Sequence, residues 1–169
     1  MNITLIGMSG VGKSFIGEKL AEALGYGFID VDRIIEGRHN LPLQGVLDVL
    51  GEPAFLQEEE SSIFSLVVTE ASVIAPGGSV VYSARAMNEL RRISIIVYLA
   101  SDIEVLASKV DPHARGIVGL KNSNFRALYQ ERKVLYERYA DHQVVVDDTE
   151  PDQIVSEIIA LSELRQKLA

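Results

Sequence analysis

Residues Gly7–Ser14 read GMSGVGKS and fill every fixed position of the phosphate-loop pattern G-x-x-x-x-G-K-[ST]. The apolar run Ile3–Ile6 precedes this loop and predicts a buried strand, and apolar residues recur at helical spacing after it. Glycines let the backbone N–H groups of such a loop approach phosphate oxygens, and the following helix adds the positive end of its dipole. We expect Lys13 to reach the terminal phosphates and Ser14 to ligate magnesium. The stretch therefore predicts a strand, loop and helix that bind a nucleoside triphosphate with Mg²⁺.

The composition predicts a single domain. The chain has 169 residues, of which 47% are apolar, and a formal net charge of -8. This negative charge argues against a nucleic-acid partner, because binding to a polyanion relies on Lys and Arg. The chain has no cysteine, which excludes disulfides and thiolate metal sites, and no apolar run of the roughly 20 residues that a membrane span needs. It opens on a strand rather than a signal segment, so we expect a cytoplasmic protein with no membrane partner.

Short apolar runs alternate with helical segments along the whole chain. The expected strands are Ile3–Ile6, Phe28–Asp32, Ser72–Ala75, Ile93–Leu99 and Gln143–Val146. Helical periodicity covers most of residues 34–69, then residues 102–110 and 125–140, and it closes the chain from about residue 151. The alternation predicts an α/β fold with three layers, in which helices cover both faces of a parallel sheet. Ligands of such folds bind at the carboxyl ends of the strands, where the unusual residues of this chain fall.

Two carboxylates end the second expected strand. If Asp30 and Asp32 alternate along a strand, one faces the phosphate loop while the other points elsewhere in the same cleft. One carboxylate near Ser14 would hold magnesium through water, and the other would orient or deprotonate an attacking hydroxyl. The alternative is that either aspartate only caps the helix that begins near Arg33.

Three further features carry candidate site residues, each with a structural alternative. The segment Pro76–Ser79 follows a strand and either presents bare N–H groups to a ligand or forms a tight turn. Arg115 lies in a polar, glycine-containing loop and is suited to a lid that neutralises charge during phosphoryl transfer. Arg132 belongs to a helix crowded with charge, where a solvated charged face is the plainer interpretation.

Taken in order, these residues resemble the shikimate kinases, a family of small P-loop kinases, from about residue 3 to residue 149. The shared features, besides the loop, are F-x-D-x-D at Phe28–Asp32, G-E-x-x-F at Gly51–Phe55 with Glu59 behind it, the pair Gly77–Gly78, Arg115, and R-x-x-L-Y-x-x-x-A-D at Arg132–Asp141. The resemblance implies one P-loop kinase domain over residues 1–169, with a sheet of five parallel strands in the order 2-3-1-4-5. It also implies a substrate-binding helical insert at about residues 33–70 and a lid at about residues 111–124.

The family's roles carry over position by position. The resemblance assigns the cofactor ATP to Gly10, Val11, Gly12, Lys13, Ser14, Phe15 and Arg115, and Mg²⁺ to Ser14 and Asp30. It assigns catalysis to Lys13, Asp32 and Arg115, and the substrate to Asp32, Gly77, Gly78, Ser79 and Arg132, with Arg132 on the substrate carboxylate. The implied reaction is phosphoryl transfer from ATP to a hydroxyl of a small carboxylated metabolite, shikimate first, by a monomer.

Four positions depart from the family pattern. Leu56 stands where the family has an arginine that helps to clamp the substrate carboxylate, and Ser79 stands where the family has a third glycine. Gly116 replaces the proline of the lid, and Ser108 takes the place of an arginine that packs on adenine. Leu56 matters most, because a charge-assisted hydrogen bond to a carboxylate is worth about 1.5 to 3 kcal/mol and leucine offers none. If the substrate is shikimate, either Arg132 holds its carboxylate alone or another cation such as Arg38 or Arg85 supplies the second contact. The alternatives are a kinase for another hydroxy metabolite or a nucleotide-binding module without catalysis.

Overall fold

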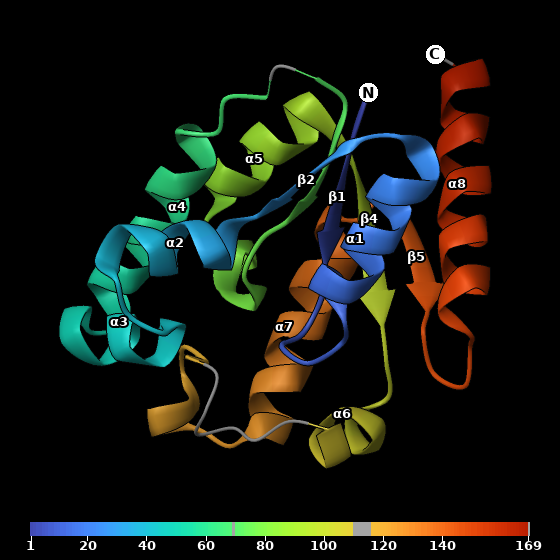
Figure 1. The fold of residues 1–169 in the computed structure, drawn as a ribbon. Coiled ribbons are helices and arrows are strands. Elements are labelled where there is room, and N and C mark those ends of the chain that lie inside the picture. The colour runs from blue at the N-terminus through green and yellow to red at the C-terminus, as the bar shows by residue number, and fades with distance from the viewer. Residues whose placement is uncertain (69, 110–115, 169) are drawn as a thin grey trace.

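The computed structural model describes residues 1–68, 70–109 and 116–168. Its five strands form one parallel sheet in the order β2-β3-β1-β4-β5 (Figure 1). The strands are β1 (Asn2–Ile6), β2 (Gly27–Asp30), β3 (Ser72–Ala75), β4 (Ser94–Ala100) and β5 (His142–Val145). The expected fold class and strand order are confirmed.

Helices cover both faces of the sheet. In the part of the chain that the structure describes they are α1 (Lys13–Leu24), α2 (Val31–His39), α3 (Leu43–Leu50), α4 (Glu52–Phe64), α5 (Ala84–Ile93), α6 (Ile103–Lys109), α7 (Phe125–Tyr139) and α8 (Pro151–Leu168), with short 3₁₀ helices η1 (Gly78–Tyr82) and η2 (Leu120–Asn122). Helices α1 and α8 pack together on one face, and α5 and α7 lie on the other (Figure 1). Helices α2, α3 and α4 pack on one another beside the sheet and correspond to the expected insert. The exact bounds of insert and lid stay a prediction.

The central strands β1 and β4 are continuous apolar runs in the sequence because their side chains lie in the core. All seven residues of β4 are buried, as are residues 3–6 of β1, because both strands have helices on each face. Apolar side chains of α1 reach this core at helical spacing, with Ile16 and Leu20 at most 3% exposed.

Two details of the sequence prediction were wrong. Strand β2 ends at Asp30, so Asp32 lies in the first turn of α2 and does not alternate with Asp30 along a strand. The helix begins early because the side chain of Asp30 accepts a hydrogen bond from the Arg33 N–H and caps it. Helix α5 was not predicted, and its beginning is capped by Ser83 in the same way.

The strand order brings distant segments to one edge. Strand β3 lies between β2 and β1, with Asp30 paired to Ala75 and Thr4 paired to Ile74. The carboxyl ends of these three strands therefore place the phosphate loop, Asp30 and the segment that begins at Pro76 next to one another. No helix among the described residues is long and apolar enough to cross a membrane.

Candidate active site

The phosphate loop connects β1 to α1 with a backbone that requires glycine. Gly7, Gly10 and Gly12 have φ angles of 149°, 87° and 98°, which L residues rarely adopt. At Gly7 there is also no room, because a Cβ would lie 2.7 Å from the carbonyl oxygen of Leu99. Helix α1 begins at Lys13, so the N–H groups of its first turn point toward the loop. This is the geometry that binds phosphate groups.

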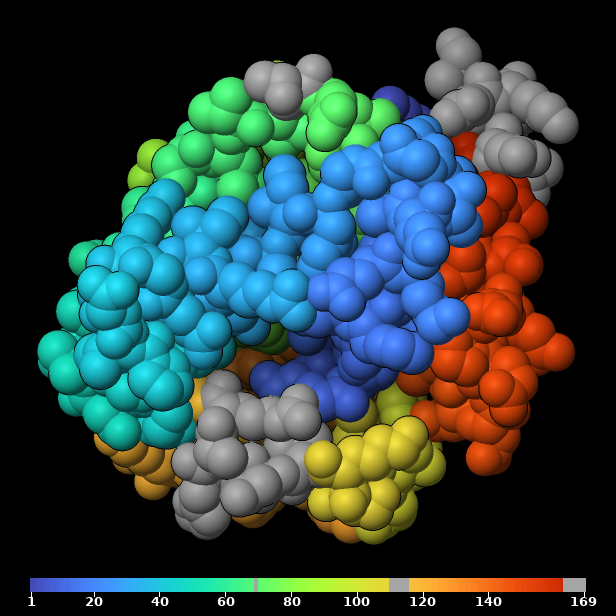
Figure 2. Space-filling model, viewed as in Figure 1, coloured from blue at the N-terminus to red at the C-terminus, as the bar shows by residue number. Residues whose placement is uncertain are grey.

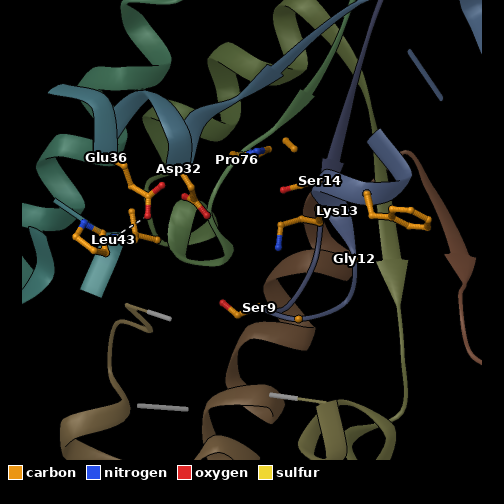
Figure 3. Close-up of a pocket in the computed structure, with 12 residues that line it drawn as sticks. Ser9, Gly12, Lys13, Ser14, Asp32, Glu36, Leu43 and Pro76 are labelled. Atoms are coloured by element: carbon orange, nitrogen blue, oxygen red, sulfur yellow. Dashed lines mark hydrogen bonds between the residues drawn. The ribbon is translucent and has the colours of Figure 1, made fainter. Parts of the chain in front are cut away.

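A cavity of about 470 Å³ opens beside this loop, within the range of small-molecule sites. It is lined by Ser9, Gly10, Gly12, Lys13, Ser14 and Phe15 on one side, and by Asp32, Glu36, Pro42, Leu43, Ala75 and Pro76 on the other. Figure 2 shows the surface hollowed between the insert helices, in cyan, and the loop and α1, in blue. In Figure 3 the side chains of Lys13 and Asp32 point into the space between these two walls. Val11 belongs to the loop itself, but its side chain is 8% exposed and packs in the hydrophobic core.

Lys13 is held against its own loop. Its Nζ donates to the carbonyl oxygens of Gly7 at 2.9 Å and Met8 at 3.1 Å, which accounts for two of its three N–H donors. Burial lowers the pKa of Lys13 to about 8, and the nearby Asp32 carboxylate opposes this shift. Lys13 is thus mainly charged at neutral pH and directed to the middle of the cavity.

Ser14 and Asp30 form the second polar pair of the loop. The Ser14 hydroxyl donates to Oδ2 of Asp30 at 2.7 Å, while Oδ1 accepts from the Arg33 N–H at 3.2 Å. Asp30 therefore caps α2 and also meets the phosphate loop, so the two interpretations of this residue are compatible. A hydroxyl and a carboxylate side by side are the hard oxygen ligands that Mg²⁺ prefers, and such sites are completed by water and phosphate oxygens.

Asp32 faces Lys13 across the cavity, on the first turn of α2 (Figure 3). Its Oδ1 is buried and has no hydrogen-bond partner among the residues that the structure describes. Burial raises the pKa of Asp32 to about 6, and Lys13 opposes the shift. A buried carboxylate oxygen without a partner is costly, and a ligand hydroxyl is one group that would satisfy it.

Glu59 is a site residue to which the sequence prediction assigned no role. It is 3% exposed on α4, and its Oε2 accepts a short hydrogen bond from the Ser79 hydroxyl. Burial raises the pKa of Glu59 to about 7, and the Ser79 hydrogen bond opposes the rise. One signal was available: Phe55, Glu59 and Ile63 recur at intervals of four, so Glu59 interrupts the apolar stripe of its helix.

Gly77 lies between the two carboxylates. A Cβ on Gly77 would overlap Oε1 of Glu59 and lie 2.8 Å from Oδ1 of Asp32. Gly77 has an ordinary φ of -60°, so glycine is needed here for space and not for backbone conformation. Together with Gly78 and Ser79 it lines a narrow cavity that continues from the main one toward Arg132.

Gly77→Ala is expected to lower the free energy of unfolding by about 1 to 3 kcal/mol, because the added methyl group displaces two buried carboxylates. Urea denaturation monitored by circular dichroism measures the change. Gly37→Ala is the matched control, since a Cβ at Gly37 meets nothing within 4 Å and alanine favours its helix. Equal stability of Gly77→Ala and wild type would contradict this crowding.

Arg132 is buried rather than on a solvated face. It is 1% exposed, donates from Nη2 to the Val118 carbonyl at 2.7 Å and from Nε to the Tyr82 hydroxyl at 3.2 Å. Its guanidinium also packs over the Tyr82 ring, 5.2 Å from the centroid. A Cβ at Gly78 would lie 3.1 Å from Nη1, so glycine leaves this edge of the guanidinium open to the narrow cavity.

Three arginines that the sequence analysis considered for the site are not found there among the described residues. Arg115 lies outside the described residues. Gly116, after it, donates to the Gln44 side chain of α3 at 2.9 Å, so this residue of the predicted lid contacts α3. Arg38 pairs with Glu58 and Arg85 with Glu60, both on α4, and neither arginine lines the main or the narrow cavity.

Leu56 lines a separate cavity of about 170 Å³, together with Glu59, Ser79 and Tyr82. The Glu59–Ser79 pair lines both this cavity and the narrow one that holds Arg132, so it lies between Leu56 and the arginine. Leu56 itself packs against the hydrophobic core. Among the described residues, Arg132 is therefore the cation that this end of the site presents.

Comparisons with known proteins agree on one family. The sequence model of shikimate kinase matches residues 9–163. The shikimate kinase of Aliivibrio fischeri is 36% identical over 167 residues, which cover 97% of each chain. A solved structure of shikimate kinase from Acinetobacter baumannii in complex with shikimate superposes with a TM-score of 0.88 at 28% identity, over 99% of this chain and 95% of that one. The shikimate kinase structure from Aquifex aeolicus gives 0.83 at 27% identity, over 96% of each chain. With a match over nearly its full length in sequence and in fold, this chain belongs to the shikimate kinase family.

Proposed function

We propose that the protein transfers the γ-phosphoryl group of ATP to a hydroxyl group of shikimate. The observation that carries this proposal is that Lys13 on the phosphate loop and Asp32 line one cavity, and that Oδ1 of Asp32 has no hydrogen-bond partner among the described residues. Family membership and the shikimate-bound relative support the choice of acceptor. Phosphoryl transfer asks little covalent chemistry of a protein, so a site of this kind works by alignment and by neutralising charge.

The donor half is built by the loop and α1. Backbone N–H groups from Gly10 to Phe15 would bind the phosphates of ATP, and Lys13 would neutralise charge on the terminal ones. Ser14 and Asp30 would hold Mg²⁺, because their adjacent oxygens match its preference. When bound, this ion neutralises phosphate charge and fixes the phosphate geometry.

The acceptor half is built by α2, η1 and α7. Asp32 would accept the hydroxyl proton as the hydroxyl oxygen attacks phosphorus, because its pKa of about 6 leaves it ionised at neutral pH. Gly77 and Gly78 lie beside Asp32 and Arg132, where the absence of a Cβ leaves Oδ1 of Asp32 and Nη1 of Arg132 uncovered by a side chain. Arg132 would bind the acceptor carboxylate, and Arg115, on the predicted lid, would neutralise charge on the transferring group.

The same proposal includes the oligomeric state and the cellular location of the protein. We expect the protein to act as a monomer in the cytoplasm, with shikimate and ATP as its small-molecule partners. Sedimentation at micromolar concentration checks the first point, and a dimer would contradict it.

Leu56→Arg tests the acceptor directly. Wild-type protein is expected to release ADP in a saturable, shikimate-dependent manner, and Leu56→Arg to lower the KM for shikimate by about tenfold or more. The reason is that arginine is longer than leucine, so its guanidinium is expected to extend past the Glu59–Ser79 pair and make a charge-assisted bond to the carboxylate that leucine cannot make. A coupled ADP assay measures both, and Leu56→Met, which keeps size without charge, is the matched control.

Other outcomes point to the alternatives. Activity that appears only in Leu56→Arg would indicate an acceptor site that has diverged from shikimate. Absence of activity in both proteins would contradict the proposal, and a panel of other hydroxy acids would then separate a kinase for another metabolite from a nucleotide-binding module.

A further inference from the structure

The proposed reaction assigns no role to the hydrogen bond between Ser79 and Glu59. Both residues are buried, at 5% and 3% exposed, and the pair lies between the cavity of Leu56 and the cavity of Arg132. The hydroxyl of Ser79 meets one carboxylate oxygen of Glu59, while the other oxygen lies beside Gly77 and Asp32. This contact needs a hydroxyl side chain at position 79, because glycine there has no hydroxyl to donate.

Some of the groups around Glu59 favour its charged form, and others favour its neutral form. The groups that face it are Asp32 from α2, Lys13 from α1, Ser79 from η1, and Arg132 and Tyr136 from α7. The neighbouring glutamate, Glu60, has its own partners in Ser83 and Arg85. Burial and Asp32 favour the neutral form of Glu59, whereas Ser79, Arg132 and Lys13 favour the charged form. Ser79 donates a hydrogen bond to Glu59 and carries no charge of its own.

The charge on Glu59 matters because of where an acceptor would bind. The narrow cavity presents Arg132 as its cation and has Asp32 and Glu59 in its lining. A carboxylated acceptor placed on Arg132 therefore approaches a second carboxylate, and the repulsion between like charges in a buried site is large. The neutral form of Glu59 binds such an acceptor better than the charged form.

We propose that Ser79 is a positioning residue, whose hydroxyl holds Glu59 in its charged, fixed form and thereby limits how tightly the site binds an anionic acceptor. The inference rests on the proposed function for the identity of that acceptor. The contact between Ser79 and Glu59 does not depend on it. At higher pH the charged form of Glu59 predominates, so the KM for the acceptor is expected to rise with pH.

Ser79→Ala tests the proposal in two ways. Without the hydroxyl, the charged form of Glu59 loses a hydrogen bond, so its pKa is expected to rise by about one unit or more above the wild-type value. Carbon-13 NMR of protein labelled at the glutamate carboxyl measures this titration, and Glu59→Gln identifies the signal by its loss. Ser79→Thr, which keeps the hydroxyl, is expected to preserve the wild-type pKa.

The second measurement is kinetic. The rise of shikimate KM with pH is expected to move upward by about one pH unit in Ser79→Ala, so that near neutral pH its KM is severalfold lower than that of wild type. The KM for ATP should change by less than about twofold, because the phosphate loop is untouched. Ser83→Ala removes a similar hydroxyl from Glu60 and is the matched control, expected to leave the pKa of Glu59 and the KM profile as in wild type.

The outcomes separate this inference from the proposed function. An unchanged Glu59 pKa in Ser79→Ala, or an equal shift in Ser79→Thr, would overturn the role of Ser79. So would a KM profile for Ser79→Ala that matches wild type, or one that still shifts in a Glu59→Gln background. If the wild type does not phosphorylate shikimate, the proposed function fails, and the NMR titration still decides whether Ser79 controls Glu59.

Discussion

Asp32→Asn is expected to lower the turnover of shikimate by about 10²- to 10⁴-fold, the usual effect of removing a general base. The amide keeps the size of the carboxylate but cannot take the hydroxyl proton. Because Asp32 lies on α2 and not on the phosphate loop, the KM for ATP should change by less than about threefold. Shikimate-dependent ADP release measured at saturating ATP gives both values.

The pH profile provides an independent test of the same residue. Burial raises the pKa of Asp32 to about 6, so the ionised base is present above that pH and lost below it. The wild-type kcat/KM for shikimate should therefore fall as the pH drops through about 6, and this dependence should be absent in Asp32→Asn. Asp152→Asn changes an exposed carboxylate on α8 and is the control, expected to retain wild-type turnover. Full activity of Asp32→Asn would remove Asp32 from its proposed role.

Lys13→Ala is expected to reduce kcat/KM for ATP by about 10³-fold or more, because the charge that stabilises the transferring phosphoryl group is lost. The variant also loses the bonds from Nζ to the Gly7 and Met8 carbonyls, which hold the loop around the ammonium group. Steady-state kinetics with varied ATP measure the loss. Calorimetry with a non-hydrolysable ATP analogue shows how much of it lies in ground-state binding.

The control for Lys13 is another lysine of the same helix. Lys19 pairs with Asp152 at 3.0 Å on the outer side of α1, so Lys19→Ala should retain wild-type kinetics. Circular dichroism checks that both variants fold. Turnover by Lys13→Ala within about tenfold of wild type would contradict the assigned role, since a residue that contacts the transferring group contributes more than this.

Local patterns were enough to predict the donor half of the site. The phosphate loop is a continuous stretch whose glycines and lysine act through backbone geometry and helix position, and both are encoded within a few residues. The parallel sheet also followed from the alternation of strands and helices, whereas the order of its strands came from the resemblance to the family. The prediction was wrong about where β2 ends. Asp30 caps α2 and also accepts a hydrogen bond from Ser14, so the strand ends at Asp30 and Asp32 lies in the helix.

The acceptor half depends on contacts between residues far apart in the chain. Arg132 looked like part of a charged helix face, and its burial became visible only with Tyr82 and Val118 packed on it. Arg38 and Arg85 were plausible partners for the acceptor until their ion pairs with Glu58 and Glu60 of α4 were seen. No periodicity in the sequence predicts such partners, because each contact joins separate elements of the fold.

The family, the fold and the expected donor end of the cleft could be read from short motifs and from the order of strands and helices. The arrangement of the buried charges, with Glu59 bonded to Ser79 and Leu56 behind that pair, became known only from the folded chain. The physical reason is that burial and electrostatic interaction depend on distance in space. A carboxylate on α4 acquires its raised pKa from helices and loops that the chain brings to it only on folding.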